Sequence, residues 1–96
     1  MEEAIIEEKA DFENIEILSD FANNFLNEIK MPEQQKQEFL MAIDEAITNI
    51  VTYAYEEGKQ NNIKIILSQK NGHAVAELID SGKKFDPSKF PEPNLD

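Results

Sequence analysis

Residues 41–55 form a helical pattern that sets the fold of this chain more firmly than any other stretch. Glu45 and Asn49 are four residues apart, so a helix places them on one side with their Cβ atoms about 5–6 Å apart. At about 100° per residue the apolar side chains fall on a separate broad arc. That arc contains Phe39, Leu40, Ile43, Ala46, Ile47, Ile50, Val51 and Ala54. The pattern predicts a helix over residues 33–56, with one buried side and one polar side.

Two interpretations of the polar side remain open at this point. In the first, Asp44, Glu45 and Asn49 are the wet side of an amphipathic helix, which is where such residues ordinarily lie. In the second, the polar side faces a cleft that holds a phosphate-bound metal. A carboxylate and a carboxamide one turn apart can serve one divalent cation and one proton transfer together. Periodicity alone does not choose between them.

The segments before this helix predict a strand and a second helix. Residues 3–8 have a short apolar centre between acids, which is typical of an edge strand. Asp11 or Asn14 is the expected N-cap of a helix that ends near Lys30, because Pro32 disfavours helical backbone in the residue before it. Its apolar stripe contains Ile15, Leu18, Ala22, Phe25, Leu26 and Ile29.

After the long helix, residues 63–68 and 74–79 are predicted strands. Asn71-Gly72 between them favours the positive φ angles of a type I′ hairpin turn. From Asp80 to Asp96 the chain shows no strand or helix period and is expected to be loop. Two helices must bury their stripes against the sheet, so we expect an α+β two-layer sandwich of helices on a mostly antiparallel sheet.

Composition excludes several kinds of partner and site. A chain of 96 residues predicts a single domain, here 1–96, and it carries a net charge of −11. That charge argues against nucleic acid and anionic membranes as partners, since both need a basic footprint. All nine basic residues are lysines, and there is no cysteine, so arginine forks, disulfides and thiol nucleophiles are excluded. Residues 1–8 lack the features of a signal peptide, so the cytoplasm is the expected location.

Asp80-Ser81-Gly82 comes directly after a predicted buried strand. An aspartate there can accept a hydrogen bond from the amino group of a base, and a glycine two residues later allows the backbone close to a ligand. The same three residues are also ordinary turn formers.

Taken jointly, two motifs resemble those of the anti-sigma-factor serine/threonine kinases. These are small members of the GHKL (histidine-kinase-like) ATPase superfamily, which has the Bergerat fold. The first motif is Glu45-Ala-Ile-Thr-Asn49 with Tyr53-Ala-Tyr55 after it, and the second is Asp80-Ser-Gly with Phe85-Asp-Pro87. The resemblance covers nearly the whole chain.

This resemblance implies an ATP and Mg²⁺ site. Asn49 matches the Mg²⁺ ligand, and Glu45 matches the general base that acts on a substrate serine. Asp80 matches the aspartate that binds the adenine amino group, and Gly82 matches the glycine that packs against the base. Phe85 lies in the segment beyond that glycine, together with Asp86 and Pro87.

The chain departs from the family pattern at two places. Tyr53 stands where many of these kinases have histidine. The family continues into a lid and a glycine-rich phosphate loop, whereas glycine occurs here only at 58, 72 and 82. The chain is therefore expected to be either a fragment of a longer kinase, which we favour, or a short relative that binds nucleotide weakly. We expect the isolated chain to be inactive. A fragment would also lack sheet strands, so in that case we expect an exposed sheet edge or a homodimer.

The resemblance predicts an ATP-dependent protein serine kinase. Such a kinase binds a sigma factor and phosphorylates an anti-anti-sigma (STAS-type) protein. Two alternatives stay open: a non-catalytic interaction domain of the same fold, and a GHKL ATPase domain that serves another signalling protein.

Overall fold

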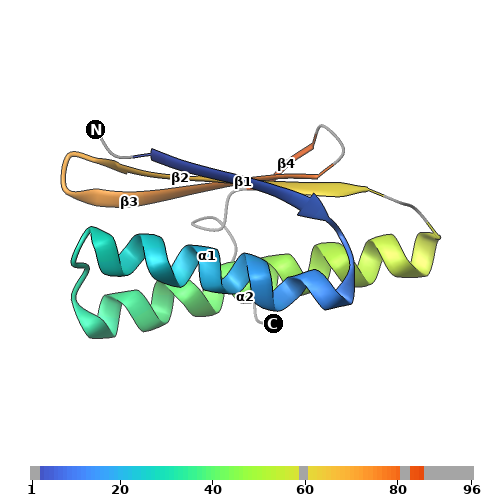
Figure 1. The fold of residues 1–96 in the computed structure, drawn as a ribbon, viewed down its shortest axis with the longest axis horizontal. Coiled ribbons are helices and arrows are strands. Elements are labelled where there is room, and N and C mark those ends of the chain that lie inside the picture. The colour runs from blue at the N-terminus through green and yellow to red at the C-terminus, as the bar shows by residue number, and fades with distance from the viewer. Residues whose placement is uncertain (1–2, 59–60, 81–82, 86–96) are drawn as a thin grey trace, which may run out of the picture.

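The computed structural model describes residues 3–58, 61–80 and 83–85. Two helices cover one face of a sheet in a two-layer α+β sandwich (Figure 1). In chain order the elements are β1 (Glu3–Lys9), the 3-10 helix η1 (Phe12–Asn14), α1 (Ile15–Glu28), α2 (Glu33–Glu57), β2 (Asn62–Lys70), β3 (His73–Asp80) and β4 (Lys83–Phe85). The predicted fold class is confirmed.

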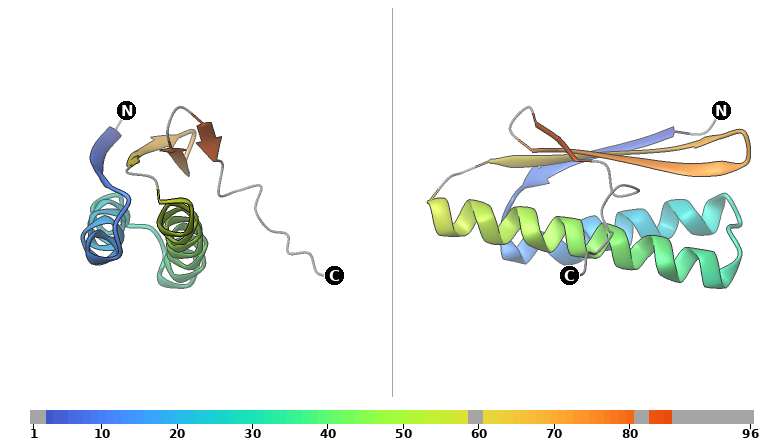
Figure 2. Two further views of the ribbon diagram at one scale, coloured as in Figure 1. Left: turned by 90° about the vertical axis from the view of Figure 1, so that its right-hand side faces the viewer. Right: turned by 180° about the vertical axis from the view of Figure 1, so that it is seen from behind.

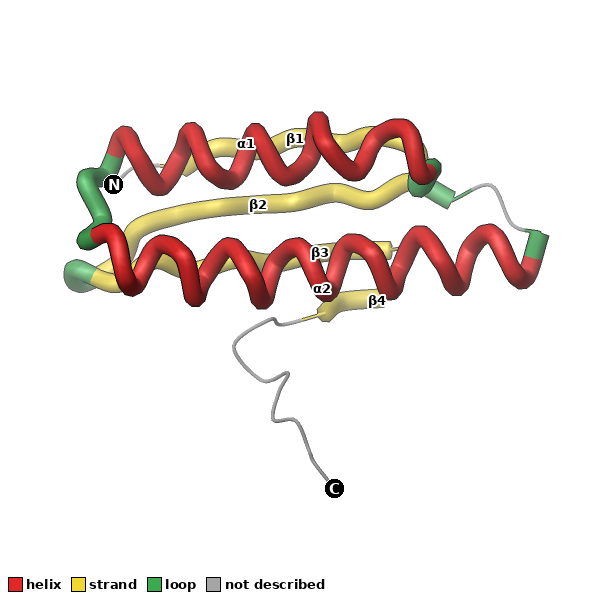
Figure 3. The backbone as a smooth tube through the Cα atoms, turned by 90° about the horizontal axis from the view of Figure 1, so that it is seen from below, coloured by secondary structure: helices red, strands yellow, loops and turns green. Residues whose placement is uncertain are grey.

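The sheet has the order β1-β2-β3-β4, and every pairing is antiparallel. β1 lies at one edge of the sheet, as its acidic flanks predicted. Seen from below, α1 runs along β1 and α2 runs along β3, with β4 on the far side of β3 (Figure 3). The end-on view in Figure 2 shows both helices on the same side of the sheet, so no helix of the described residues covers its other face.

The hairpin between β2 and β3 turns where the sequence predicted. Asn71 has a φ angle of 52° and Gly72 one of 79°. Positive φ at both central residues is what a type I′ turn requires. The register that follows pairs Ile65 with Leu78 and Ile63 with Asp80.

Alternation along the strands separates the buried core from the outer face of the sheet. Successive side chains of a strand point to opposite faces. Those on the helix side are buried: Ile63, Ile65 and Leu67 of β2, and Ala76, Leu78 and Asp80 of β3. They meet the predicted stripes of both helices, in which Leu18, Leu26, Ile43 and Ile47 are fully buried.

The ends of the helices follow local chemistry, with one difference from expectation. α1 begins after Asn14, but the Asn14 side chain does not cap it and instead donates a hydrogen bond to the Lys9 carbonyl at 3.0 Å. α2 ends at Gly58, whose φ of 67° is left-handed and whose N–H reaches the Tyr55 carbonyl at 3.1 Å. Glycine adopts this conformation without the steric cost that other residues meet.

The expectation of loop from Asp80 to the end of the chain is wrong at its start. Asp80 is the last residue of β3, and residues 83–85 form β4. β4 pairs with β3 so that Asp80 faces Lys83 and Leu78 faces Phe85. A strand of three residues is too short to show a period of two, and its pairing comes from the free edge of β3. The predicted loop beyond Phe85 lies outside the described residues.

No helix among the residues that the structure describes is long and apolar enough to cross a membrane.

Candidate functional site

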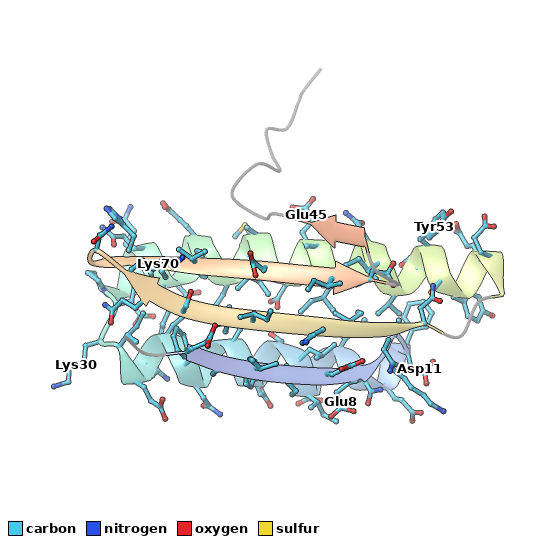
Figure 4. The ribbon with its side chains drawn as sticks, turned by 90° about the horizontal axis from the view of Figure 1, so that it is seen from above. Glu8, Asp11, Lys30, Glu45, Tyr53 and Lys70 are labelled. Carbon is cyan, nitrogen blue, oxygen red and sulfur yellow. The ribbon has the colours of Figure 1, made fainter. Side chains whose placement is uncertain are left out.

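The structure places Glu45 and Asn49 on the exposed side of α2. Both side chains are exposed, whereas Ala46, Ile47 and Ile50 between and beside them are buried. Figure 4 shows Glu45 on the side of α2 where β4 lies. The buried residues anchor the helix, so the carboxylate and the carboxamide project from a rigid element one turn apart.

Tyr53 extends this stripe by one further turn. Its ring is 52% exposed, and Figure 4 shows it on the same side of the molecule as Glu45. Met41, one turn before Glu45, is 70% exposed. The polar pair therefore lies between two large exposed side chains on one side of α2.

The surroundings of Asp44 differ from the first interpretation, in which Asp44, Glu45 and Asn49 all lie on the wet side of the helix. Asp44 is not part of a uniform wet side, because its Oδ1 accepts a 2.7 Å hydrogen bond from the Ser19 hydroxyl of α1. One residue is about 100° of helix, enough to turn Asp44 toward α1 while Glu45 turns away from it. The bond fixes the rotation of α2 about its axis and so fixes the direction in which Glu45 and Asn49 project.

Sequence reasoning missed Ser19. The available signal was a serine inside an apolar helical stripe, beside Leu18 and three residues before Ala22. A serine in that setting needs a hydrogen-bond partner. Nothing local in the sequence, however, identifies a partner 25 residues away.

Asp80 lies at the carboxyl end of β3 and is only 6% exposed. It shares the helix-facing side of the sheet with Ala76 and Leu78, because the three alternate along β3. α2 runs beneath β3 (Figure 3), so this carboxylate belongs to the layer between the sheet and the helix that carries Glu45 and Asn49.

The other residues of the second motif are placed only in part. Phe85 is the last residue of β4 and lies in register with Leu78. Gly82, Asp86 and Pro87 lie outside the described residues. β4, which contains Phe85, lies alongside β3 on the same side of the molecule as Glu45 (Figure 4).

The donor set fits a nucleotide with a hard divalent cation. Asn49 offers a neutral carboxamide oxygen, and Mg²⁺ takes one or two such protein ligands together with phosphates and waters. Asp80 offers a buried carboxylate, and a hydrogen bond from a base amino group is stronger there than one in water. A Mg²⁺ ion bound in this way does not need a cluster of acidic ligands from the protein.

The family model of the histidine kinase-like ATPase domain matches residues 9–96, which include both motifs. No curated protein matches the chain. An ATPase domain of this kind implies ATP binding. With the match spanning most of the sequence and the fold agreeing with it, the chain belongs to the histidine kinase-like ATPase domain family, within the GHKL superfamily.

Proposed function

We propose that this chain is the ATP-binding part of a regulatory protein serine kinase, with the site between the exposed stripe of α2 and the end of β3. The observation that carries the proposal is the placement of Glu45 and Asn49. They project one turn apart on the β4 side of α2, while Asp80 lies buried in the strand above that helix.

Each residue has a role in this proposal. Asn49 would hold Mg²⁺, which would supply positive charge beside the ATP phosphates. Asp80 accepts a hydrogen bond from the adenine amino group, with Gly82 and Phe85 beside the base. Glu45 takes the proton from the substrate serine as its Oγ attacks the γ-phosphorus and ADP leaves. Such a mechanism depends on positioning and electrostatics, which rigid elements supply.

The proposed partners are a sigma factor and an anti-anti-sigma (STAS-type) protein that carries the acceptor serine. The residue types and spacing of the two motifs support this choice, since they are typical of the anti-sigma kinases. The net charge of −11 also suits a partner with a basic surface. The alternatives are an interaction domain that no longer turns over ATP, and an ATPase domain of another signalling protein.

The dependence of nucleotide binding on Mg²⁺ tests the site. ATP is titrated into the protein by calorimetry with and without Mg²⁺, and the wild type should bind more tightly with the metal. Asn49→Ala should lose that gain but keep the metal-free affinity, whereas Thr48→Ala, an exposed neighbour, should keep both. Absence of nucleotide binding to the wild type would favour the interaction domain. If Mg²⁺ increased the ATP affinity of Asn49→Ala as much as that of the wild type, Asn49 would not be a ligand of the metal.

The role of Glu45 requires a separate measurement. In the intact protein, Glu45→Gln should keep nucleotide affinity and lose at least about 100-fold in phosphoryl transfer to the serine, a typical loss for a general base. The phosphorylated STAS-type protein is measured by mass spectrometry. Glu38→Gln, an exposed acid earlier in α2, is the matched control. Unchanged transfer by Glu45→Gln would show that another group is the base.

A further inference from the structure

A hollow lies away from the Glu45–Asn49 stripe, where the end of β1 meets the end of α2. It encloses about 330 Å³ and is lined by residues 9–12 together with Ala54, Tyr55, Gly58 and Asn61. Figure 4 shows Asp11 beside the end of β1 and Tyr53 across the sheet from it, beyond β3. The two sites are therefore on opposite sides of α2. A hollow of this volume is at the small end of ligand sites and suits a single side chain.

Two exposed aromatic rings form one wall of this hollow. Phe12 and Tyr55 meet edge to face, with ring centroids 5.4 Å apart and planes at 68°. They are 51% and 73% exposed, so the pair contributes little to the core of the protein. An aromatic face beside a hollow attracts a cation through the ring quadrupole.

The charges around the rings also favour a cation. Asp11 lines the hollow, and its side chain makes no capping hydrogen bond to η1. α2 ends here, and its last turn contains no basic residue but does contain Glu56 and Glu57. The carbonyl end of a helix carries partial negative charge, which these two acids reinforce. Among the lining residues that the structure describes, Lys9 is the one cation, at the end of β1.

We propose that this hollow, defined by Asp11, Phe12 and Tyr55, docks an arginine side chain from a basic segment of a partner protein. A guanidinium is planar, stacks on aromatic faces and pairs with a carboxylate through two hydrogen bonds, which matches the rings and Asp11. The chain contains no arginine, so a second copy of the same chain does not supply the group. This site is independent of nucleotide binding on the far side of α2.

The test is an NMR titration of the wild-type protein with three blocked pentapeptides. They have the sequence Gly-Ser-Xaa-Ser-Gly, with arginine, neutral citrulline or glutamate at Xaa. The arginine peptide should shift the amide signals of Phe12 and Tyr55 and bind about tenfold more tightly than the citrulline peptide, as a cation–π contact plus an ion pair implies. The glutamate peptide should not bind.

Matched variants locate the site. Tyr55→Ala and Asp11→Asn should each lose most of the arginine preference, whereas Tyr53→Ala should retain it. Lys9→Gln should tighten arginine binding about two- to threefold, because it removes a positive charge from the lining. Equal binding of the citrulline peptide, or shifts spread over the whole acidic surface, would overturn the proposal. An equal loss of the arginine preference in Tyr53→Ala would also overturn it. Amide signals of Phe12 and Tyr55 that move on dilution without peptide would identify a second copy as the occupant and would overturn it as well.

Discussion

Neighbouring acidic residues on α2 have different surroundings. Asp44 accepts a hydrogen bond from Ser19 and ties the two helices together, while Glu45 is exposed on the side that the proposed nucleotide site uses. In this account Asp44 is a positioning residue, because the direction of Glu45 depends on how α2 is rotated against α1. The sequence alone does not distinguish these two acids, because both are acidic residues on the polar side of the same predicted helix.

Removing the Ser19–Asp44 bond should weaken the helix pair. Ser19→Ala leaves a partly buried carboxylate without its donor, so we expect the free energy of unfolding to fall by about 1–2 kcal/mol. The measurement is urea denaturation followed by circular dichroism, with Asp44→Ala and the double variant completing a cycle. A coupling energy near zero would show that the bond does not hold the helices in register.

Glu33 gives a prediction about pH. Its carboxylate accepts a 2.8 Å hydrogen bond from the Gln37 side chain, and the Lys36 ammonium lies 3.4 Å away. The Gln37 hydrogen bond is the largest single cause that holds the pKa of Glu33 below its ordinary value of 4.5, and Lys36 lowers the pKa further through a hydrogen bond and its charge. The small stabilisation is therefore present above that value and is lost as pH falls through the lowered pKa. An NMR titration should show that this pKa rises in Gln37→Ala and also in Lys36→Met, and an unchanged pKa in either variant would contradict the assignment.

At the scale of elements, periodicity and turn chemistry predicted both helices, the first three strands and the type I′ turn. Those elements are long or have a specific dipeptide, and their local preferences agree with the tertiary structure. β4 was not predicted, because three residues carry no measurable period and the edge of β3 decides their conformation. The 3-10 turn at Phe12–Asn14 was missed for a similar reason, and the hollow it lines was missed with it.

The end of α2 depends on Gly58. Its φ of 67° is left-handed, and a Cβ added there would meet no atom within 4 Å. Gly58→Ala should therefore destabilise the protein by about 1 kcal/mol through backbone strain alone. Gly58→Asn should cost less, since asparagine tolerates this conformation. Thermal unfolding of both variants measures the difference, and equal losses would point to a cause other than backbone conformation.

At the scale of the whole molecule, one face of the sheet is buried under the helices, and in the part of the chain that the structure describes no helix covers the other face. Ile65 and Ile66 are neighbours in β2, but Ile65 is fully buried and Ile66 is partly exposed on the outer face. Ile65→Ala should cost about 2–5 kcal/mol, because it leaves a cavity between the layers. Ile66→Ala should cost less than about half of that. Similar losses in urea denaturation would mean that the outer face is also packed in solution.

The sequence placed Glu45 and Asn49 on α2, as the structure has them, but it assigned Asp80 and Phe85 to loop, whereas they lie in β3 and β4. Glu45 and Asn49 follow from helical spacing, and Asp80 follows from its place directly after a predicted strand. That α2 lies beneath β3, with Asp80 buried on the helix side, depends on packing between two segments that β2 separates in the sequence, and a local pattern does not contain this information.

The central claim is that α2 and the end of β3 bind one adenine nucleotide, and base discrimination tests it most directly. ADP and IDP, which carries a carbonyl in place of the adenine amino group, are titrated by NMR into wild type and Asp80→Asn with Mg²⁺ present. The wild type should prefer ADP by about 10- to 100-fold, the worth of a hydrogen bond to a charged group, and Asp80→Asn should lose that preference. Equal binding of both nucleotides to the wild type, or an unchanged preference in Asp80→Asn, would contradict the account.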